Sequence, residues 1–260
     1  MHPGHGGREP QTRREPGTMP FAIGALGMIA AVSYSSWVLE VFLNPHLDVL
    51  DGYVSELSAR DQPYHLVFSA GDFITGVLTM LIAATALARL RRRPLAVTGW
   101  ILLLSFGGWV IGDSVFSMDC APSIDTTCAL RERAGTLSFS HQFHEVTSSM
   151  VIFSGIAAIL VLSIAARRYG WWPALARWGR PLAVTEAALA VATLALMLAG
   201  RWLGLVQRVQ ISVLALALFV IAWALLTDAR RPRSSGTRPA PVPAPARPRA
   251  ALLGADRGVE

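Results

Sequence analysis

The sequence predicts an all-α membrane protein, a bundle of six transmembrane helices with both termini in the cytoplasm. Only 15% of the 260 residues are charged, whereas soluble domains carry about 25%, and the mean hydropathy is +0.44. Six long apolar stretches follow one another along the chain, and arginines cluster in alternate connections between them. The low charge indicates the class of protein, and the arginines indicate how it is oriented.

Each apolar stretch has about the 20 residues that a helix needs to cross the hydrocarbon core of a bilayer. Helices are expected rather than barrel strands, because the stretches are unbroken and lack alternation of polar and apolar residues. The predicted spans cover residues 21–43, 66–89, 95–117, 143–166, 182–200 and 205–227.

The arginines orient these spans. All 23 basic residues are arginines. Fifteen of them lie near span ends in the N-terminal segment, the connections around residues 90 and 175, and the segment after the last span, and the other three connections hold four. Positive residues are enriched in cytoplasmic loops. The connections 44–65, 118–142 and 201–204 are therefore predicted to lie outside the plasma membrane. The net charge of +6 does not indicate nucleic-acid binding, because the chain has no basic stripe with interleaved aromatic residues.

Polar segments rich in proline flank the predicted membrane domain, residues 20–228. Residues 1–19 are expected to be a disordered tail, and Met19 is an alternative start of the chain. Residues 229–260 contain the run PAPVPAPARPRA and are expected to be a disordered cytoplasmic tail. A protein partner could bind this tail or the helix face with Gly108 and Gly112, although internal helix packing also explains such a glycine pair.

Cys120 and Cys128 both lie in the connection 118–142. If this connection is outside the cell, the compartment is oxidising and the two cysteines are expected to form a disulfide. Two free thiols would follow from the inverted topology. Their spacing does not match the CxxC pattern of zinc sites.

Charged side chains occur in the outer half of five predicted spans. They are Glu40, Asp72, Asp113, Glu145 and Arg208. Because charges in lipid are costly unless they are paired or hydrated, these side chains are expected to face the bundle interior. Arg208 is the natural partner of Asp113, Glu40 or Asp72. The residues form either a structural ion-pair network or an outward-facing polar pocket that also includes Asp119, His141 and His144.

The two histidines and Asp119 are candidate ligands of a divalent metal, the one cofactor that the sequence suggests. His141 and His144 are three residues apart and share a helix face if the helix begins early enough. Asp119 would add a carboxylate to this set, and Asp113 or Glu145 would be the candidate catalytic residue, acting as general base. The run HQFHE is not the HExxH motif, and ordinary hydrogen-bonded histidines are the alternative.

Short motifs in two segments resemble a known family. Residues 54–78 contain Ser55, Glu56 and Leu57 before the second span, and residues 115–153 contain Phe116, Asp119 and Cys120, then His144. These elements resemble the bacterial membrane proteins of domain of unknown function 998, which are distantly similar to the FRAG/DRAM/Sfk group of six-helix proteins. The resemblance covers roughly residues 20–200. It implies a multi-pass protein of the bacterial plasma membrane, and it implies no established reaction.

The leading hypothesis is an integral membrane protein whose polar pocket, roofed by residues 44–65 and 118–142, binds or senses a lipid headgroup or a small amphiphile. The enzyme alternative is a metal-assisted lipid hydrolase. A proton-coupled transporter using Asp72 and Glu186 is a third hypothesis, and a structural accessory subunit is a fourth. The sequence does not decide whether the protein is an enzyme.

Overall fold

Helices form the framework of the chain in a computed structural model, which describes residues 19–90 and 92–230. These described residues belong to one compact unit. No strand occurs in these described ranges. The tails predicted at residues 1–19 and 229–260 lie outside them, apart from Met19 and the two residues at the end of the last helix.

Five helices are long and apolar enough to cross a membrane, and a bent pair of helices provides a sixth span if it is counted as one. The five are α3 (His65–Arg89), α4 (Pro94–Val115), α6 (Phe139–Tyr169), α7 (Pro173–Ala199) and α8 (Leu203–Ala229). The bent pair joins α1 (Phe21–Ser33) to the short helices η1 (Ser36–Leu39) and α2 (Glu40–Leu43). The prediction of an all-α, multi-pass membrane bundle is confirmed.

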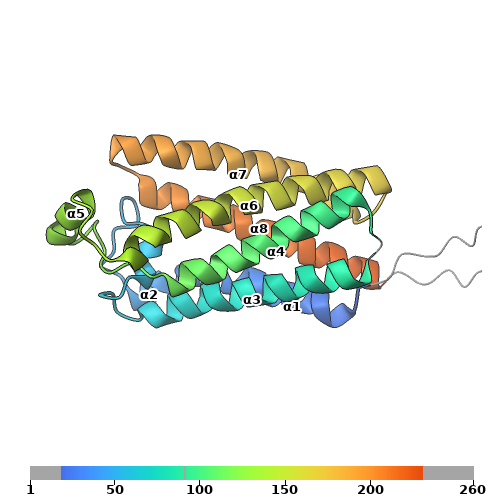
Figure 1. The fold of residues 1–260 in the computed structure, drawn as a ribbon, viewed down its shortest axis with the longest axis horizontal. Helices are drawn as coiled ribbons and strands as arrows, with labels where there is room; N and C mark the ends of the chain where they lie inside the picture. The colour runs from blue at the N-terminus through green and yellow to red at the C-terminus, as the bar shows by residue number, and fades with distance from the viewer. Residues whose placement is uncertain (1–18, 91, 231–260) are drawn as a thin grey trace, which may run out of the picture. The chain divides into compact units, whose positions relative to one another are not determined.

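The helices run up and down, so that the connections gather at two ends (Figure 1). At one end the Arg230 guanidinium lies 5.1 Å from the ring centre of Phe21, and the Arg93 guanidinium lies 5.7 Å from that of Tyr169. The first contact joins the start of α1 to the end of α8, and the second joins the α3–α4 turn to the α6–α7 turn. The opposite end, called the α5 end here, carries residues 44–64, α5 (Thr126–Arg133) and the α7–α8 turn. The arginine distribution predicts that the α5 end faces outward.

The first predicted span, 21–43, is not one straight helix. The axis bends by 42° between α1 and the segment that follows it. At the break the Ser35 hydroxyl donates to the Ala31 carbonyl at 3.1 Å, and the Ser35 and Val38 amides donate to carbonyls three residues earlier. Bonds of this spacing belong to a tighter helix than the α-helix. The chain therefore leaves the axis of α1 before it reaches Glu40.

The fifth span begins earlier than predicted. The α7 helix starts at Pro173 and continues through Pro181, whereas the apolar run suggests a start at residue 182. Pro173 occupies the first turn, where a missing amide costs no hydrogen bond. Trp172 directly before the helix is 2% exposed and packs edge-on against Trp100, with ring centres 5.6 Å apart. Trp172 therefore belongs to the protein core.

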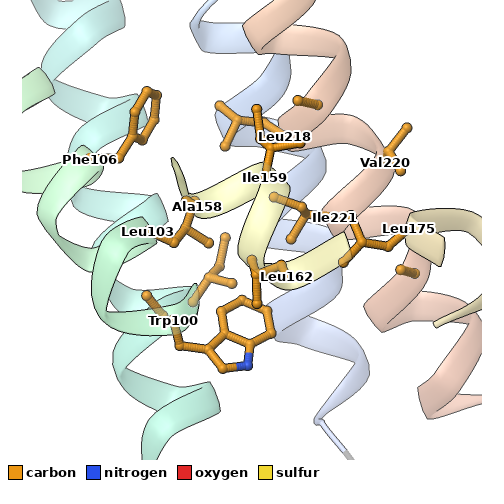
Figure 2. Close-up of a cluster of buried hydrophobic side chains, with 14 of the residues drawn as sticks. Trp100, Leu103, Phe106, Ala158, Ile159, Leu162, Leu175, Leu218, Val220 and Ile221 are labelled. Atoms are coloured by element: carbon orange, nitrogen blue, oxygen red, sulfur yellow. The ribbon is translucent and has the colours of Figure 1, made fainter. Parts of the chain in front are cut away.

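Large apolar side chains from α4, α6, α7 and α8 fill the centre of the bundle (Figure 2). Trp100, Phe106, Leu162, Leu175 and Leu214 are each at most 2% exposed. A void of about 10 Å³ remains between α4, α6 and α8, next to Phe106 and Leu214. That volume suits no more than one water molecule, so the interior offers no space for a ligand there.

The two glycines proposed as a partner face have different surroundings. A Cβ atom built on Gly112 would lie 3.2 Å from Cγ2 of Thr147 on α6, so this glycine takes part in packing inside the bundle. No described atom lies within 4 Å of a Cβ atom built on Gly108. A partner at Gly108 stays a prediction.

Candidate functional site

Glu40 and Arg208 form a buried ion pair at the α5 end. Glu40 is the first residue of α2, and Arg208 lies on the second turn of α8. The guanidinium donates from Nε to Oε1 of Glu40 at 2.8 Å and from Nη2 to Oε2 at 2.6 Å. Both residues are 4% exposed. A two-pronged contact of this kind fixes both side chains in one orientation, and it therefore links α2 to α8.

Arg208 also binds the loop that follows α2. Its Nη1 donates to the carbonyl oxygens of Val49 at 3.0 Å and Gly52 at 2.9 Å. Four of the five guanidinium N–H groups are thus used by Glu40 and this loop. The cost of burying the arginine charge is reduced by the opposite charge and by these hydrogen bonds.

Residues 44–52, called the capping loop here, cover the start of α8. The Asp51 carboxylate accepts a hydrogen bond from the Trp202 amide at 2.5 Å, and the Leu50 carbonyl accepts one from the Leu205 amide at 3.1 Å. Backbone amides at a helix start lack partners inside the helix, and a negative charge is favourable there. The capping loop is therefore fixed to α8 by its backbone as well as by Arg208.

An open groove of about 500 Å³ lies beside the ion pair, between α8 and the segment η1–α2. Its lining residues are Trp37, Glu40, Val41, Val49, Leu205, Arg208, Val209, Ser212, Val213 and Leu216. Leu205 and Leu216 are eleven positions apart on α8, which corresponds to about 16 Å along the helix. The groove thus begins at the first turn of α8 and reaches toward the middle of that span.

The groove lies between the break in the first span and the α5 end of the bundle, and 'above' is used here for the direction toward the α5 end. Below the break α1 and α8 are in close contact, since a Cβ atom on Gly27 would lie 2.7 Å from that of Ala222, and one on Gly24 would lie 2.7 Å from Leu226. Above the break the chain has turned by 42°, and α2 reaches α8 through the long side chains of Glu40 and Arg208. The space between the separated segments is the groove.

The rim of the groove is apolar and open to the side of the bundle. Val41 is 64% exposed, Leu216 is 49% exposed and Val209 is 44% exposed. Side chains of this kind on a spanning helix face the hydrocarbon of the bilayer. The groove therefore opens at the side of the bundle among exposed apolar side chains.

A second polar group links α4 to α6. The Nδ1 atom of His144 lies 3.0 Å from the Phe116 carbonyl oxygen and 3.2 Å from Oδ1 of Asp113. Because a carbonyl oxygen only accepts, Nδ1 of His144 carries a proton. The hydroxyls of Thr147 and Ser148 donate to the same Asp113 oxygen at 2.7 Å each. The group is well hydrogen-bonded and holds the two helices together.

A third polar group surrounds His141. Nδ1 of His141 accepts from the Asp119 amide at 3.1 Å, so Nε2 carries the proton that faces Glu132 at 3.2 Å. The Asp119 carboxylate accepts from the Ser138 amide at 2.8 Å and hydroxyl at 2.6 Å. Burial alone raises the pKa of Asp119, but the Ser138 hydrogen bonds, with a smaller contribution from the charge of Arg60, outweigh it and lower this pKa below its ordinary value.

The connections on either side of α3 and α4 dock onto each other through Glu56. This residue, in η2 (Val54–Ser58), is completely buried, and its carboxylate accepts from the Tyr53 amide, the Ser123 amide and the Ser123 hydroxyl. Asp61 adds a bond from the Ala121 amide at 3.3 Å. Burial raises the pKa of Glu56 although its hydrogen bonds act in the opposite direction. Glu56 therefore joins the two connections at a buried point.

Cys120 and Cys128 form a disulfide in the structure, with their Cα atoms 6.1 Å apart. The bridge closes the segment that leads into α5, next to the contact between Ser123 and Glu56. The oxidising compartment that would maintain this bond stays a prediction.

The eight residues predicted to line one pocket are distributed over separate surroundings. Glu40 and Arg208 line the groove, and the sequence did name Glu40 as one of three partners for Arg208. Asp113 and His144 form the second polar group, and Asp119 and His141 form the third. Asp72 is half-buried on α3 and Glu145 is exposed on α6. Of the two connections predicted to roof the pocket, residues 44–65 contribute only Val49 to the groove lining, and residues 118–142 contribute no lining residue.

The described ranges contain no group of three or more His, Cys, Asp or Glu side chains that could hold a metal ion. Of the candidate ligands Asp119, His141 and His144, each uses its polar side-chain atoms in hydrogen bonds to protein. The two candidate catalytic residues have different surroundings, because Asp113 accepts hydrogen bonds inside the bundle and Glu145 is exposed.

Several residues of these groups escaped sequence reasoning. Trp37 and Ser212 line the groove, yet a tryptophan and a serine in apolar runs are ordinary features of spanning helices. Glu132 lies in a polar connection, where the sequence gives no sign that it contacts His141. Only their place in the folded chain distinguishes these residues.

A family model described as "Protein of unknown function (DUF998)" matches residues 27–224. The chain belongs to the DUF998 family. No curated protein and no solved structure matches it. In this DUF998 protein the motif residues make contacts between separate segments of the chain. Glu56 joins two connections, Asp119 binds Ser138, and His144 binds Asp113. The family match covers both sides of the groove, since it includes η1, α2 and most of α8.

Proposed function

We propose that this DUF998 protein of the bacterial plasma membrane binds a membrane amphiphile in the groove between η1–α2 and α8. The observation that carries the proposal is the groove itself, which is about 500 Å³ in volume, apolar along most of its length, and has a buried ion pair near one end. Binding sites for small molecules commonly combine such a volume with a few placed polar groups.

The position of the groove suits an amphiphile that enters from the bilayer. Val41, Val209 and Leu216 leave it open at the side, so that a hydrocarbon chain can move in without passing through water. The hydrophobic effect gives little driving force there, because the chain leaves one apolar environment for another. Selectivity would then come from the fit of the chain and from contacts of its polar end.

The polar end would lie at the first turn of α8. Glu40 and Arg208 are within the upper part of the groove, and the capping loop lies directly above them. The arginine distribution predicts that this end faces outward, so the bound amphiphile would belong to the outer leaflet.

A metal-assisted hydrolase and a proton-coupled transporter have weaker support. The hydrolase needs a metal site, and the described residues provide no suitable group of ligands. The transporter hypothesis relied on Asp72 and Glu186, and neither residue lines the groove. The groove is thus the feature that supports binding.

Filling the groove tests the proposal. Val209→Trp would place an indole in the space beside Ser212, and Val191→Trp on α7, where the valine is 70% exposed, is the matched control. Each variant is purified in mild detergent, and the lipid that remains bound per chain is measured by native mass spectrometry. We expect Val209→Trp to lose most of the lipid that wild type and Val191→Trp retain. Equal retention by all three proteins would refute binding in the groove.

A further inference from the structure

Exposed arginines gather at the end of the bundle opposite to α5. They come from three segments, which are the α3–α4 turn, the last turn of α6 and the beginning of α7, and they are called the arginine cluster here: Arg93, Arg167, Arg168, Arg177 and Arg180. The Arg93 guanidinium stacks on the ring of Tyr169 at 5.7 Å, and Nε of Arg167 donates to the carbonyl oxygen of Ala176 at 2.7 Å. These two contacts join the end of α6 to both other segments and bring their arginines together.

Aromatic contacts hold Arg93 in place without neutralising it. The Tyr169 ring that it covers packs against Trp171 with ring centres 5.0 Å apart, and Trp171 packs edge-on against Trp172 at 5.5 Å. Trp172 is buried in the core. A cation over the face of an aromatic ring is attracted by the ring and keeps its charge. Arg93 is thus supported from the core, and its positive charge remains available to a partner.

Arg167 has unused hydrogen-bond donors. A guanidinium group has five N–H donors, and the contact with Ala176 uses the one on Nε. The two Nη atoms of Arg167 have no acceptor among the described residues. Arg177 directly follows Ala176 and stacks on Trp178, with its guanidinium 5.2 Å from the ring centre. A free pair of Nη groups therefore lies close to a second exposed arginine.

Acids do not balance the charges of the arginine cluster. None of the four ion pairs in the described ranges includes one of its arginines. Of the described acids, only Asp228 lies near this end of the bundle, and it belongs to the end of α8. Like charges that lie close together repel each other, and an anion between them removes this repulsion. The arginine cluster therefore favours an anionic partner.

The surroundings of the arginine cluster favour a lipid over a soluble anion. Arg180 and Val184 are four positions apart on α7 and therefore share a face of the helix. Val184 is 66% exposed. Trp178 is exposed as well, and tryptophan is enriched at the level of the lipid headgroups. The arginines thus lie at the end of an exposed apolar helix face, where a phospholipid carries its phosphate.

We propose that the arginine cluster binds the phosphate of an anionic phospholipid, at a site separate from the groove. The Nη groups of Arg167 would bind two phosphate oxygens, as the planar guanidinium geometry allows, and the other arginines would add positive charge. The acyl chains would pass Val184 toward the middle of the bilayer. They would end before Val191, because Val191 lies about 16 Å along the helix from Arg180 and half of the hydrocarbon core is about 15 Å thick.

The test is a lipid titration of the delipidated full-length protein, followed by native mass spectrometry. The probes are phosphatidylglycerol, which is anionic, and phosphatidylcholine with the same acyl chains, which has no net charge. Lipid is added at known concentrations, because contacts at an exposed site exchange in detergent. A basic residue near an anionic lipid contributes about fivefold in affinity. We therefore expect phosphatidylglycerol to bind more tightly than phosphatidylcholine by a factor of about five or more.

Variants connect this preference to the arginine cluster. Arg177→Gln removes one exposed charge and should weaken phosphatidylglycerol binding about fivefold, while phosphatidylcholine binding is unchanged. Arg167→Lys keeps the charge but cannot offer a planar pair of donors, so it should also weaken phosphatidylglycerol binding. Arg131→Gln removes an exposed arginine of α5 and is the matched control. It should bind both lipids as the wild type does.

The outcomes separate this site from the groove. Equal binding of the two lipids by wild type would overturn the proposal. An equal loss of preference in Arg131→Gln and Arg177→Gln would also overturn it, because the net charge of the protein would then explain the preference. Displacement of phosphatidylglycerol by inorganic phosphate at the same concentration would overturn the assignment to a lipid. The proposal predicts that Val209→Trp keeps the preference, and its disappearance there would assign it to the groove instead.

Discussion

Removing one partner of the Glu40–Arg208 pair should destabilise the bundle far more than removing both. In Glu40→Leu the guanidinium stays at a position that is 4% exposed, and it loses two of its four hydrogen bonds together with the opposite charge. Breaking a buried ion pair in this way costs about 3–5 kcal/mol, whereas replacing the whole pair by apolar residues is often close to neutral.

The same reasoning gives values for a full mutant cycle. Arg208→Leu leaves the Glu40 carboxylate buried and also frees the carbonyls of Val49 and Gly52, so it should cost at least as much as Glu40→Leu. The double variant should recover about 2 kcal/mol or more relative to either single variant. Glu145→Leu, which replaces an exposed acid, should change stability by less than about 0.5 kcal/mol.

The free energy of unfolding can be measured for these variants by titration with SDS in mixed micelles, followed by circular dichroism. The reasoning predicts two strongly destabilised single variants and a partly restored double variant. A double variant that is destabilised by the sum of the two single effects would refute it, because the pair would then contribute no coupling energy. Single variants that behave like Glu145→Leu would show that the ion pair does not form.

Three further predictions follow from the loops and the helix contacts. Since burial raises the pKa of Glu56, the folded state binds the proton of this carboxyl more tightly than the unfolded state, and the free energy of unfolding should fall as pH rises above about 4.5. Thermal unfolding measured against pH should therefore show a flatter profile for Glu56→Gln than for wild type. Identical profiles would contradict the burial argument. Replacing Cys120 and Cys128 by serine removes a bridge with a sequence separation of 8, which should lower the free energy of unfolding by about 2.5 kcal/mol. In the wild-type protein of intact cells, a membrane-impermeant thiol reagent should label the two cysteines only after reduction. Labelling without reduction would show that the bond is absent. Gly27→Val forces a side chain into Ala222 and should cost about 1–3 kcal/mol, whereas Gly108→Val, where the structure leaves open space, should be close to neutral in the same unfolding assay, and the reverse order would contradict the α1–α8 contact.

Hydropathy alone predicted most of the membrane bundle. The helix α3 begins at His65 and the predicted span began at residue 66, while α4 ends two residues before the predicted limit of 117. Such agreement arises because the length of an apolar run has to match the bilayer. The break after Ser33 was not predicted, since serines are tolerated in spanning helices and the run remains apolar on both sides of the bend.

The grouping of the polar residues was harder to predict. Glu40 and Arg208 are 168 positions apart, and the register between α2 and α8 that brings them together depends on packing lower in the bundle, at Gly27 and Ala222. The sequence identified Arg208 as needing an acid and offered three candidates of similar depth. Depth follows from the position in a span, whereas the choice among neighbours at one depth follows from the helix arrangement.

Photo-crosslinking of the detergent-purified protein tests the central claim most directly. The photoreactive residue p-benzoylphenylalanine is introduced at Val209, inside the groove, or at Val191 on the exposed face of α7. Loosely bound lipid is removed in detergent, and the protein is then irradiated. Covalently attached lipid is identified by mass spectrometry. The account predicts a lipid adduct at position 209 and none at position 191. An unmodified chain at position 209, or the same adduct at both positions, would contradict it.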